Sequence, residues 1–219
     1  MDIRVVKQVI EDSKDCSNDI KEILRSKKVY LINVMGSPGT GKTSVIIELI
    51  NILKSIYNIA VVEGDIAGKV DAEKIDALGI SVVQLNTEGA CHIEPLSIKN
   101  ILQYFDLNEI DIIFVENVGN LVCPAEYDIG ADLKIAILSI PEGDDKVEKY
   151  PLLFTEADIT ILNKYDMLQH FEFDHNKVEE NILALKPDAN IFKVSTRTKE
   201  GIPELSKVLE EKLKATIGK

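Results

Sequence analysis

An apolar run leads directly into a glycine-rich loop and then into a segment of helical periodicity. The run Val29–Val34 precedes Gly36-Ser-Pro-Gly-Thr-Gly-Lys-Thr43, and apolar residues recur at helical spacing over Thr43–Ile56. The loop matches the spacing of the phosphate-binding P-loop in full. Because this motif needs a strand before it and a helix after it, it predicts an α/β fold with a parallel sheet.

The predicted loop supplies the contacts that a nucleotide phosphate needs. Its backbone N–H groups and the helix N-terminus would point at the anion. Lys42 would reach the β- and γ-phosphates, and the Thr43 hydroxyl would ligate Mg²⁺. The alternative, a glycine-rich turn beside an exposed lysine, is disfavoured by the strand–loop–helix context. The loop residues expected to contact nucleotide are Gly36, Ser37, Gly39, Thr40, Gly41, Lys42, Thr43 and Ser44.

The same alternation of strand and helix continues along the chain, which predicts a mostly parallel β-sheet flanked by helices. Further strands are expected at Ile59–Glu63, Ile80–Leu85, Asp111–Glu116, Ile135–Ile140, Asp158–Leu162 and Ile191–Val194, and further helices at Glu94–Phe105, His175–Leu185 and Pro203–Ala215. Residues 29–219 are predicted to form the P-loop domain. Residues 1–28 are predicted as a short N-terminal helical segment of one or two helices, because apolar residues fall three or four apart at Ile3, Val6 and Ile10 and again at Ile20, Ile23 and Leu24.

Bulk properties exclude several classes of partner. The net charge of −12 would repel nucleic acid and an anionic membrane surface. No apolar run approaches the roughly 20 residues of a membrane span, and no secretory signal begins the chain, which predicts a cytoplasmic protein. The three cysteines, Cys16, Cys91 and Cys123, are too few for a disulfide framework and are expected to be thiols.

Two carboxylates follow predicted strands on the side of the sheet where ligands of open α/β folds collect. Glu116 ends its strand and could hold Mg²⁺ through water, and Asp65 is a second candidate for the magnesium shell. Gly119 has no side chain, so its amide could approach a γ-phosphate. The alternatives are a solvated strand-end acid for Glu116 and a turn-forming role before Gly68 for Asp65.

The segment Asn163-Lys-Tyr-Asp166 follows another predicted strand and suits the recognition of guanine. The Asp166 carboxylate could accept from the ring N–H and the exocyclic amine of guanine, whereas adenine presents an acceptor where guanine presents a donor. A mismatched base would leave a buried polar group unpaired, which predicts GTP rather than ATP. Lys164 would lie along the base. A backbone N–H that could meet the guanine carbonyl is expected within Ser195, Thr196 and Arg197.

Two thiols and one imidazole form a soft ligand set suited to Zn²⁺ or Ni²⁺. On an extended segment, the neighbouring side chains of Cys91 and His92 would point in different directions, so they are not expected to reach one ion from one chain. A metal shared across a two-fold axis would resolve this, which predicts a homodimer. Cys123 lies four residues beyond Gly119, so a switch there would move a metal ligand. The alternative is two core cysteines and a surface histidine.

Six sequence segments together resemble the HypB family, the GTPases that assist nickel insertion into [NiFe]-hydrogenase. The most specific is Glu-Asn-Val-Gly-Asn-Leu-Val-Cys-Pro-Ala-Glu at 116–126. The others are the P-loop, Glu-Gly-Asp-Ile-Ala with Asp71-Ala-Glu at 63–73, Cys91-His92, Glu-Gly-Asp-Asp at 142–145 and Asn-Lys-Tyr-Asp at 163–166.

The resemblance implies a GTPase that dimerises in a GTP-dependent manner and binds nickel or zinc through Cys91, His92 and Cys123 at the subunit interface. It implies a hydrogenase large subunit and a companion nickel-binding accessory protein as partners. It also makes Asp71 a candidate for orienting the attacking water. The predicted catalytic residues are then Lys42, Asp71 and Gly119. No glutamine follows Gly119, so slow intrinsic turnover is expected.

Two other functions are alternatives to a GTP-hydrolysing metallochaperone. One is a GTP-gated binding protein in which the metal is purely structural, and nucleotide-dependent metal release would distinguish the two. The other is a metabolite or nucleotide kinase, which would have no need of the guanine pocket predicted at 163–166.

Overall fold

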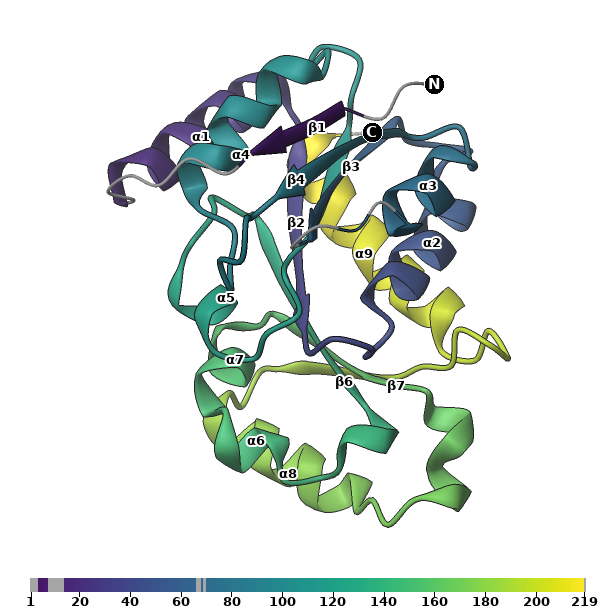
Figure 1. Ribbon diagram of the computed structural model, residues 1–219. Coiled ribbons are helices and arrows are strands. Elements are labelled where there is room, and N and C mark those ends of the chain that lie inside the picture. The colour runs from purple at the N-terminus through teal and green to yellow at the C-terminus, as the bar shows by residue number, and fades with distance from the viewer. Residues whose placement is uncertain (1–3, 8–13, 66–67, 69, 219) are drawn as a thin grey trace.

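A single sheet of parallel strands forms the centre of the protein (Figure 1). The computed structural model describes residues 4–7, 14–65, 68 and 70–218. Within these residues the sheet has eight strands in the order β1-β4-β3-β5-β2-β6-β7-β8. The strands are β1 (Arg4–Lys7), β2 (Tyr30–Gly36), β3 (Ile59–Asp65), β4 (Ser81–Asn86), β5 (Ile112–Glu116), β6 (Leu133–Ser139), β7 (Ile159–Asn163) and β8 (Asn190–Lys193).

Helices cover both faces of this sheet (Figure 1). One face packs against α2 (Lys42–Leu53), α3 (Val70–Asp76) and α9 (Ile202–Ile217). The other packs against α1 (Lys14–Lys27), α4 (Pro95–Ile101), α5 (Cys123–Glu126), α6 (Lys146–Lys149), α7 (Pro151–Glu156) and α8 (His175–Leu185). Short 3₁₀ helices span Leu102–Tyr104, Ile140–Glu142 and Tyr165–His170.

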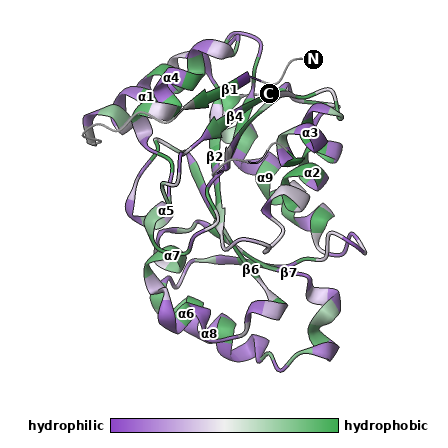
Figure 2. Ribbon diagram, in the orientation of Figure 1, coloured by the Kyte–Doolittle hydropathy of each residue, from purple (hydrophilic) through white to green (hydrophobic). Residues whose placement is uncertain are grey.

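Burial on both faces explains why the strands read as continuous apolar runs. In β2, Ile32 packs into the core under α2 and α9, while its neighbour Leu31 packs into the core under α1 and α4. In Figure 2, hydrophobic residues are green, and green segments recur along the strands of the sheet. The α/β fold class, with a parallel sheet flanked by helices, is confirmed.

The parallel arrangement places the carboxyl ends of all strands at one edge of the sheet. The P-loop follows β2, Asp65 ends β3, Glu116 ends β5 and Asn163 ends β7. The P-loop and Asn163, which are more than a hundred positions apart in the sequence, therefore lie at the same edge of the sheet.

The prediction of a purely helical N-terminal segment is wrong for Arg4–Lys7, which forms β1 and pairs parallel to β4. The edge of β4 would otherwise leave backbone N–H and C=O groups unpaired, and pairing with β1 satisfies them. Val6 of the predicted helical pattern is partly buried against the core under α1. Ile3 and Ile10 of the same pattern lie outside the described residues.

The second half of the N-terminal segment forms α1, as its helical spacing indicated. Ile20 and Leu24 are buried against the sheet. Lys21 Nζ donates to Asp128 Oδ2 at 2.6 Å, and Asp19 Oδ2 accepts from Lys99 Nζ of α4 at 2.6 Å. The helix thus contacts the segments that follow Cys123 and His92.

Other boundaries follow the sequence closely. The helix predicted at His175–Leu185 has those ends, and Asp174 caps it by accepting from the amides of Asn176 and Lys177. The helices α3, α5, α6 and α7 were not predicted, because each has seven residues or fewer and too few turns to establish a period. The equally short α4 was predicted, because the 3₁₀ helix Leu102–Tyr104 continues it. Among the described residues, no helix combines the length and the apolar character of a bilayer span.

Candidate functional site

A cavity of about 530 Å³ opens at the carboxyl edge of the sheet, between the P-loop and the ends of β3 and β5. It brings together the residues predicted for phosphate, magnesium and catalysis: Gly39, Gly41, Lys42, Thr43, Ser44, Asp65, Asp71, Glu116 and Gly119. Pro38, Glu63 and Lys164 also line it. Gly36, Ser37 and Thr40, also predicted as loop residues, are not part of this lining.

The P-loop is folded around the position that a phosphate would take. Gly41 caps α2 with φ +94°, and a Cβ there would lie 2.5 Å from Asn163 Nδ2. Lys42 is buried, and its Nζ donates to the carbonyl oxygens of Gly36 at 3.3 Å and Ser37 at 3.2 Å. Burial lowers the pKa of Lys42, although Glu116 opposes that shift. A phosphate would offer this ammonium a full negative charge in place of two carbonyl dipoles.

Buried carboxylates gather beside Lys42. Thr43 Oγ1 donates to Glu116 Oε1 at 2.9 Å, and Glu63 is the in-register neighbour of Glu116 on β3. Burial raises the pKa of Glu63 to about 8 and that of Glu116 to about 7. Among the described residues, neither Glu63 Oε2 nor Glu116 Oε2 has a hydrogen-bond partner. Buried carboxylate oxygens next to a threonine hydroxyl fit a hard divalent cation such as Mg²⁺.

Glu63 is a residue of the cavity that was not among the predicted site residues. The available signal was its position two residues before Asp65 on one strand, because alternate residues of a strand face the same side of the sheet. Both side chains line the cavity.

Asp65 and Asp71 reach the cavity while making local contacts. Asp65 Oδ2 accepts from the Gly68 amide at 2.8 Å, so the turn-forming role that was weighed for Asp65 coexists with a place in the cavity. Asp71 lies in the first turn of α3, and its Oδ1 accepts from Lys74 Nζ at 2.7 Å.

Gly119 packs directly on the P-loop. A Cβ at Gly119 would lie 2.7–2.9 Å from three atoms of Pro38, one of them a backbone atom. Only a residue without a side chain can make this approach without displacing the P-loop.

The predicted base-recognition residues meet next to the P-loop. Asn163 Nδ2 donates to the Thr40 carbonyl at 2.7 Å, and Lys164 Nζ donates to the Gly39 carbonyl at 2.6 Å. Asp166 Oδ1 accepts from Ser195 Oγ at 2.7 Å, and this contact, together with Arg197, lowers the pKa of Asp166. A second cavity of about 520 Å³ is lined by Lys164, Asp166, Met167, His170, Thr196 and Arg197.

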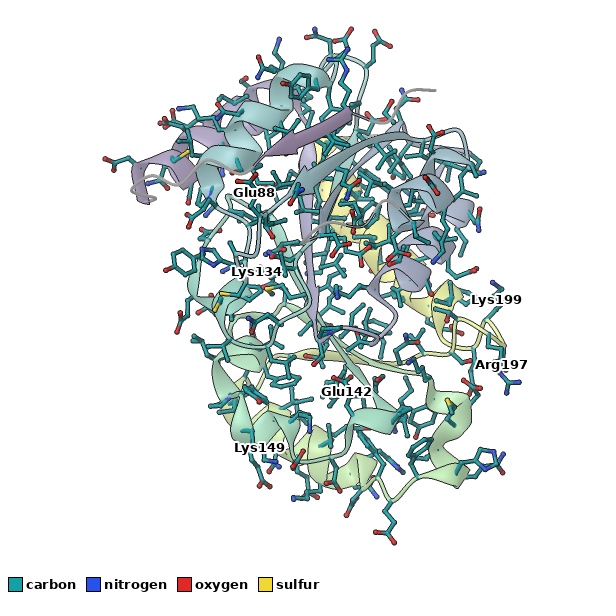
Figure 3. The ribbon with its side chains drawn as sticks, in the orientation of Figure 1. Glu88, Lys134, Glu142, Lys149, Arg197 and Lys199 are labelled. Carbon is teal, nitrogen blue, oxygen red and sulfur yellow. The ribbon has the colours of Figure 1, made fainter. Side chains whose placement is uncertain are left out.

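The loop after β8 closes the other side of this second cavity. The Ser195 amide donates to the Glu200 carbonyl at 3.0 Å, so it is already occupied and the predicted contact to a base carbonyl would fall to Thr196 or Arg197. Arg197 Nε donates to Asp166 Oδ2 at 2.8 Å, while its side chain is 78% exposed at the outer edge of the molecule (Figure 3).

Cys91, His92 and Cys123 form a compact group within one chain. Their ligand atoms lie within 4.8 Å of one another, and the two sulfur atoms are 2.8 Å apart. The prediction that Cys91 and His92 would diverge is wrong, because the chain bends at these residues instead of continuing extended after β4. The three side chains therefore do not by themselves require a second subunit. Two thiols and an imidazole at this separation fit a soft or borderline cation.

The buried acid Glu63 generates a prediction about stability and pH. Its pKa is about 8 in the folded protein, against an ordinary value of 4.5, so between these values the folded state holds a proton that the unfolded state releases. The free energy of unfolding of the nucleotide-free, magnesium-free protein should therefore fall as the pH rises from about 4.5 to about 8. Glu63→Gln should remove most of this loss, which amounts to at most a few kcal/mol.

Urea unfolding at a series of pH values measures this effect, with Glu73→Gln on the exposed face of α3 as the matched control. Glu116, Asp65, Asp71 and Lys42 face Glu63, so some pH dependence should persist in the variant. Parallel pH profiles for Glu63→Gln and the wild type would contradict the prediction.

Proteins of known family that resemble this chain also have a nucleotide-binding domain. Residues 30–193 match the family model described as CobW/HypB/UreG, nucleotide-binding domain. The chain is 39% identical over 214 residues to the hydrogenase/urease maturation factor HypB of Helicobacter hepaticus, which covers 96% of this chain and 88% of that protein.

Solved structures show the same fold. The crystal structure of HypB from Helicobacter pylori in complex with nickel has a TM-score of 0.85 at 36% identity, covering 92% of this chain and 94% of that one. HypB from Archaeoglobus fulgidus has a TM-score of 0.86 at 31% identity, covering 91% of this chain and 97% of that one. With its P-loop, its strand-end acids and its thiol–imidazole group, the chain belongs to the CobW/HypB/UreG family and, within it, to the HypB proteins.

Proposed function

We propose that this protein is a GTP-hydrolysing metallochaperone that binds nickel or zinc and delivers metal during [NiFe]-hydrogenase maturation, with its nucleotide state gating the metal. The main support for the proposal is that the loop between β5 and α5 contacts the P-loop at one end and carries a thiol of the metal-ligand group at the other. At one end Gly119 packs on Pro38 of the P-loop, and four residues later Cys123 lies 2.8 Å from Cys91. The names of the similar proteins, hydrogenase maturation factors and a nickel complex, support the choice of metal and target.

Hydrolysis would take place in the cavity beside the P-loop. Lys42 would leave its loop carbonyls for the β- and γ-phosphates, and Thr43, Glu116 and Asp65 would hold Mg²⁺. The bound ion would supply positive charge to the phosphate oxygens. Asp71 would orient a water that attacks the γ-phosphorus, the bond to the β-phosphate oxygen would break, and GDP and phosphate would leave.

Guanine would bind in the second cavity. Asp166 would exchange its contact with the exposed Arg197 for the two adjacent donors of the base, while Ser195 keeps the carboxylate oriented. Asn163 and Lys164 tie this cavity to the P-loop through Thr40 and Gly39, which would fix the distance between base and phosphate sites.

The metal would be held by Cys91, His92 and Cys123 and exchanged when the loop that carries Gly119 moves. Cys91 is exposed, so the site is open to a second copy of the chain. We propose a GTP-dependent homodimer that acts in the cytoplasm, with a hydrogenase large subunit and a companion nickel-binding accessory protein as partners. A purely structural metal in a GTP-gated binding protein is the rival function, and it predicts metal affinity that does not respond to nucleotide.

The guanine site predicts a change of base preference in Asp166→Asn. The variant should lose about 10²-fold in GDP affinity, because two hydrogen bonds to a carboxylate are replaced by contacts to a neutral amide. Its amide N–H₂ can donate to a carbonyl at the same position of the base, so xanthosine diphosphate should bind better than GDP. Calorimetry with both nucleotides measures this, with exposed Asp188→Asn as the control. Wild-type GDP affinity in Asp166→Asn would refute the assignment.

The metal site predicts that Cys123→Ser abolishes stoichiometric Zn²⁺ and Ni²⁺ binding and leaves GDP affinity within about twofold. The reason is that one of three soft ligands is lost, while the P-loop is untouched. Equilibrium dialysis with metal analysis measures the first quantity and calorimetry the second. Cys16→Ser on α1 is the matched thiol control and should bind metal normally. Full retention of metal by Cys123→Ser would refute Cys123 as a ligand; the alternative of two core cysteines is wrong for Cys91, which is exposed.

A further inference from the structure

The imidazole of His92 is held from two sides by residues outside the thiol–imidazole group. Its Nε2 lies 2.8 Å from Glu94 Oε1. Its ring stacks on Tyr127, with centroids 3.8 Å apart and planes 16° from parallel. The side chains of His92 and Glu94 are only 12% and 10% exposed, so water competes little for their contact.

Glu94 is well placed to hold this geometry. It lies immediately before α4, where its carbonyl accepts from the Ser97 amide at 3.0 Å. The helix itself is anchored by the fully buried side chains of Ile98 and Ile101. Tyr127 comes from the other side of the site, directly after α5, which begins at Cys123. The ring of His92 is therefore clamped between the two segments that carry the thiols.

The contact with Glu94 decides which nitrogen can bind a metal. A carboxylate accepts hydrogen bonds and cannot donate, so the contact places the proton of the neutral imidazole on Nε2. The lone pair then resides on Nδ1, which lies 3.7 Å from Cys91 Sγ. Metal-binding histidines commonly donate their other ring N–H to a carboxylate, which fixes the ring and makes it a stronger ligand.

We propose that Glu94 is the positioning residue of the metal site, holding His92 so that Nδ1 is the ligand atom offered to the ion beside Cys91 and Cys123. This inference rests on the metal binding proposed above and adds the residue that builds the site in the metal-free chain. It assigns Tyr127 the role of keeping the ring plane fixed.

The test is Zn²⁺ binding to protein labelled with ¹⁵N-histidine, because the nitrogen shifts identify the ligating ring atom. In the wild type, Nδ1 of His92 should be the ligand, with the signals assigned by comparison with His92→Asn. Glu94→Ala should lower Zn²⁺ affinity by about 10–100-fold and lose exclusive Nδ1 coordination. Glu94→Gln should keep Nδ1 coordination with a smaller loss of affinity, since an amide oxygen still accepts from Nε2–H.

Glu126→Gln is the matched control, because Glu126 is an exposed acid near Cys123 that affects the thiol only through its charge. It should leave both affinity and ligating atom unchanged. A merely structural role for Glu94 would lower the melting temperature of Glu94→Ala but leave Nδ1 ligation and Zn²⁺ affinity intact, and that result would overturn the proposal. So would Nε2 ligation in the wild type. Failure of the metal site itself would be recognised separately, because Cys123→Ser would then bind Zn²⁺ as the wild type does.

Discussion

The close approach of Gly119 to Pro38 connects the two chemical sites of this protein. The glycine sits in the loop after β5, where any side chain would collide with the P-loop backbone, so the two loops are packed against each other without a gap. Cys123 begins α5 four residues later, and Tyr127 follows that helix to stack on His92. In the proposed function, a displacement of the P-loop at this contact would move Cys123 and the ring of His92 through this short piece of chain.

The charged side chains of the nucleotide cavity should respond to the binding of a cation and a nucleotide. Glu63, Asp65, Asp71 and Glu116 line the cavity together with the ammonium of Lys42, and burial keeps Glu63 and Glu116 partly protonated near neutral pH. A divalent cation would favour their ionised forms, while the nucleotide brings the phosphate charge that Lys42 can balance. Cation and nucleotide should thus bind cooperatively, and loss of a phosphoryl group should disturb the arrangement that Gly119 contacts.

Much of the fold and of the nucleotide site could be predicted from the sequence, because short local motifs determine them. The P-loop, Glu116 and Asn163–Asp166 each follow a strand, and a parallel sheet must bring their positions to one edge. Arg4–Lys7 was mistaken for helix because four residues cannot reveal that a neighbouring strand edge needs a partner. The bend at Cys91 and His92, and the role of Glu94 beside them, depend on tertiary packing that spacing along the chain does not encode.

We expect phosphate occupancy at the P-loop to change the affinity of the thiol–imidazole group for metal. Ni²⁺ and Zn²⁺ should be titrated into the wild-type protein saturated first with Mg²⁺ and GDP and then with Mg²⁺ and a non-hydrolysable GTP analogue, with molecular mass followed throughout. The dissociation constants for metal should differ by at least fivefold between the two nucleotide states, a coupling of about 1 kcal/mol. Identical metal affinities in both states, at the same oligomeric mass, would contradict it.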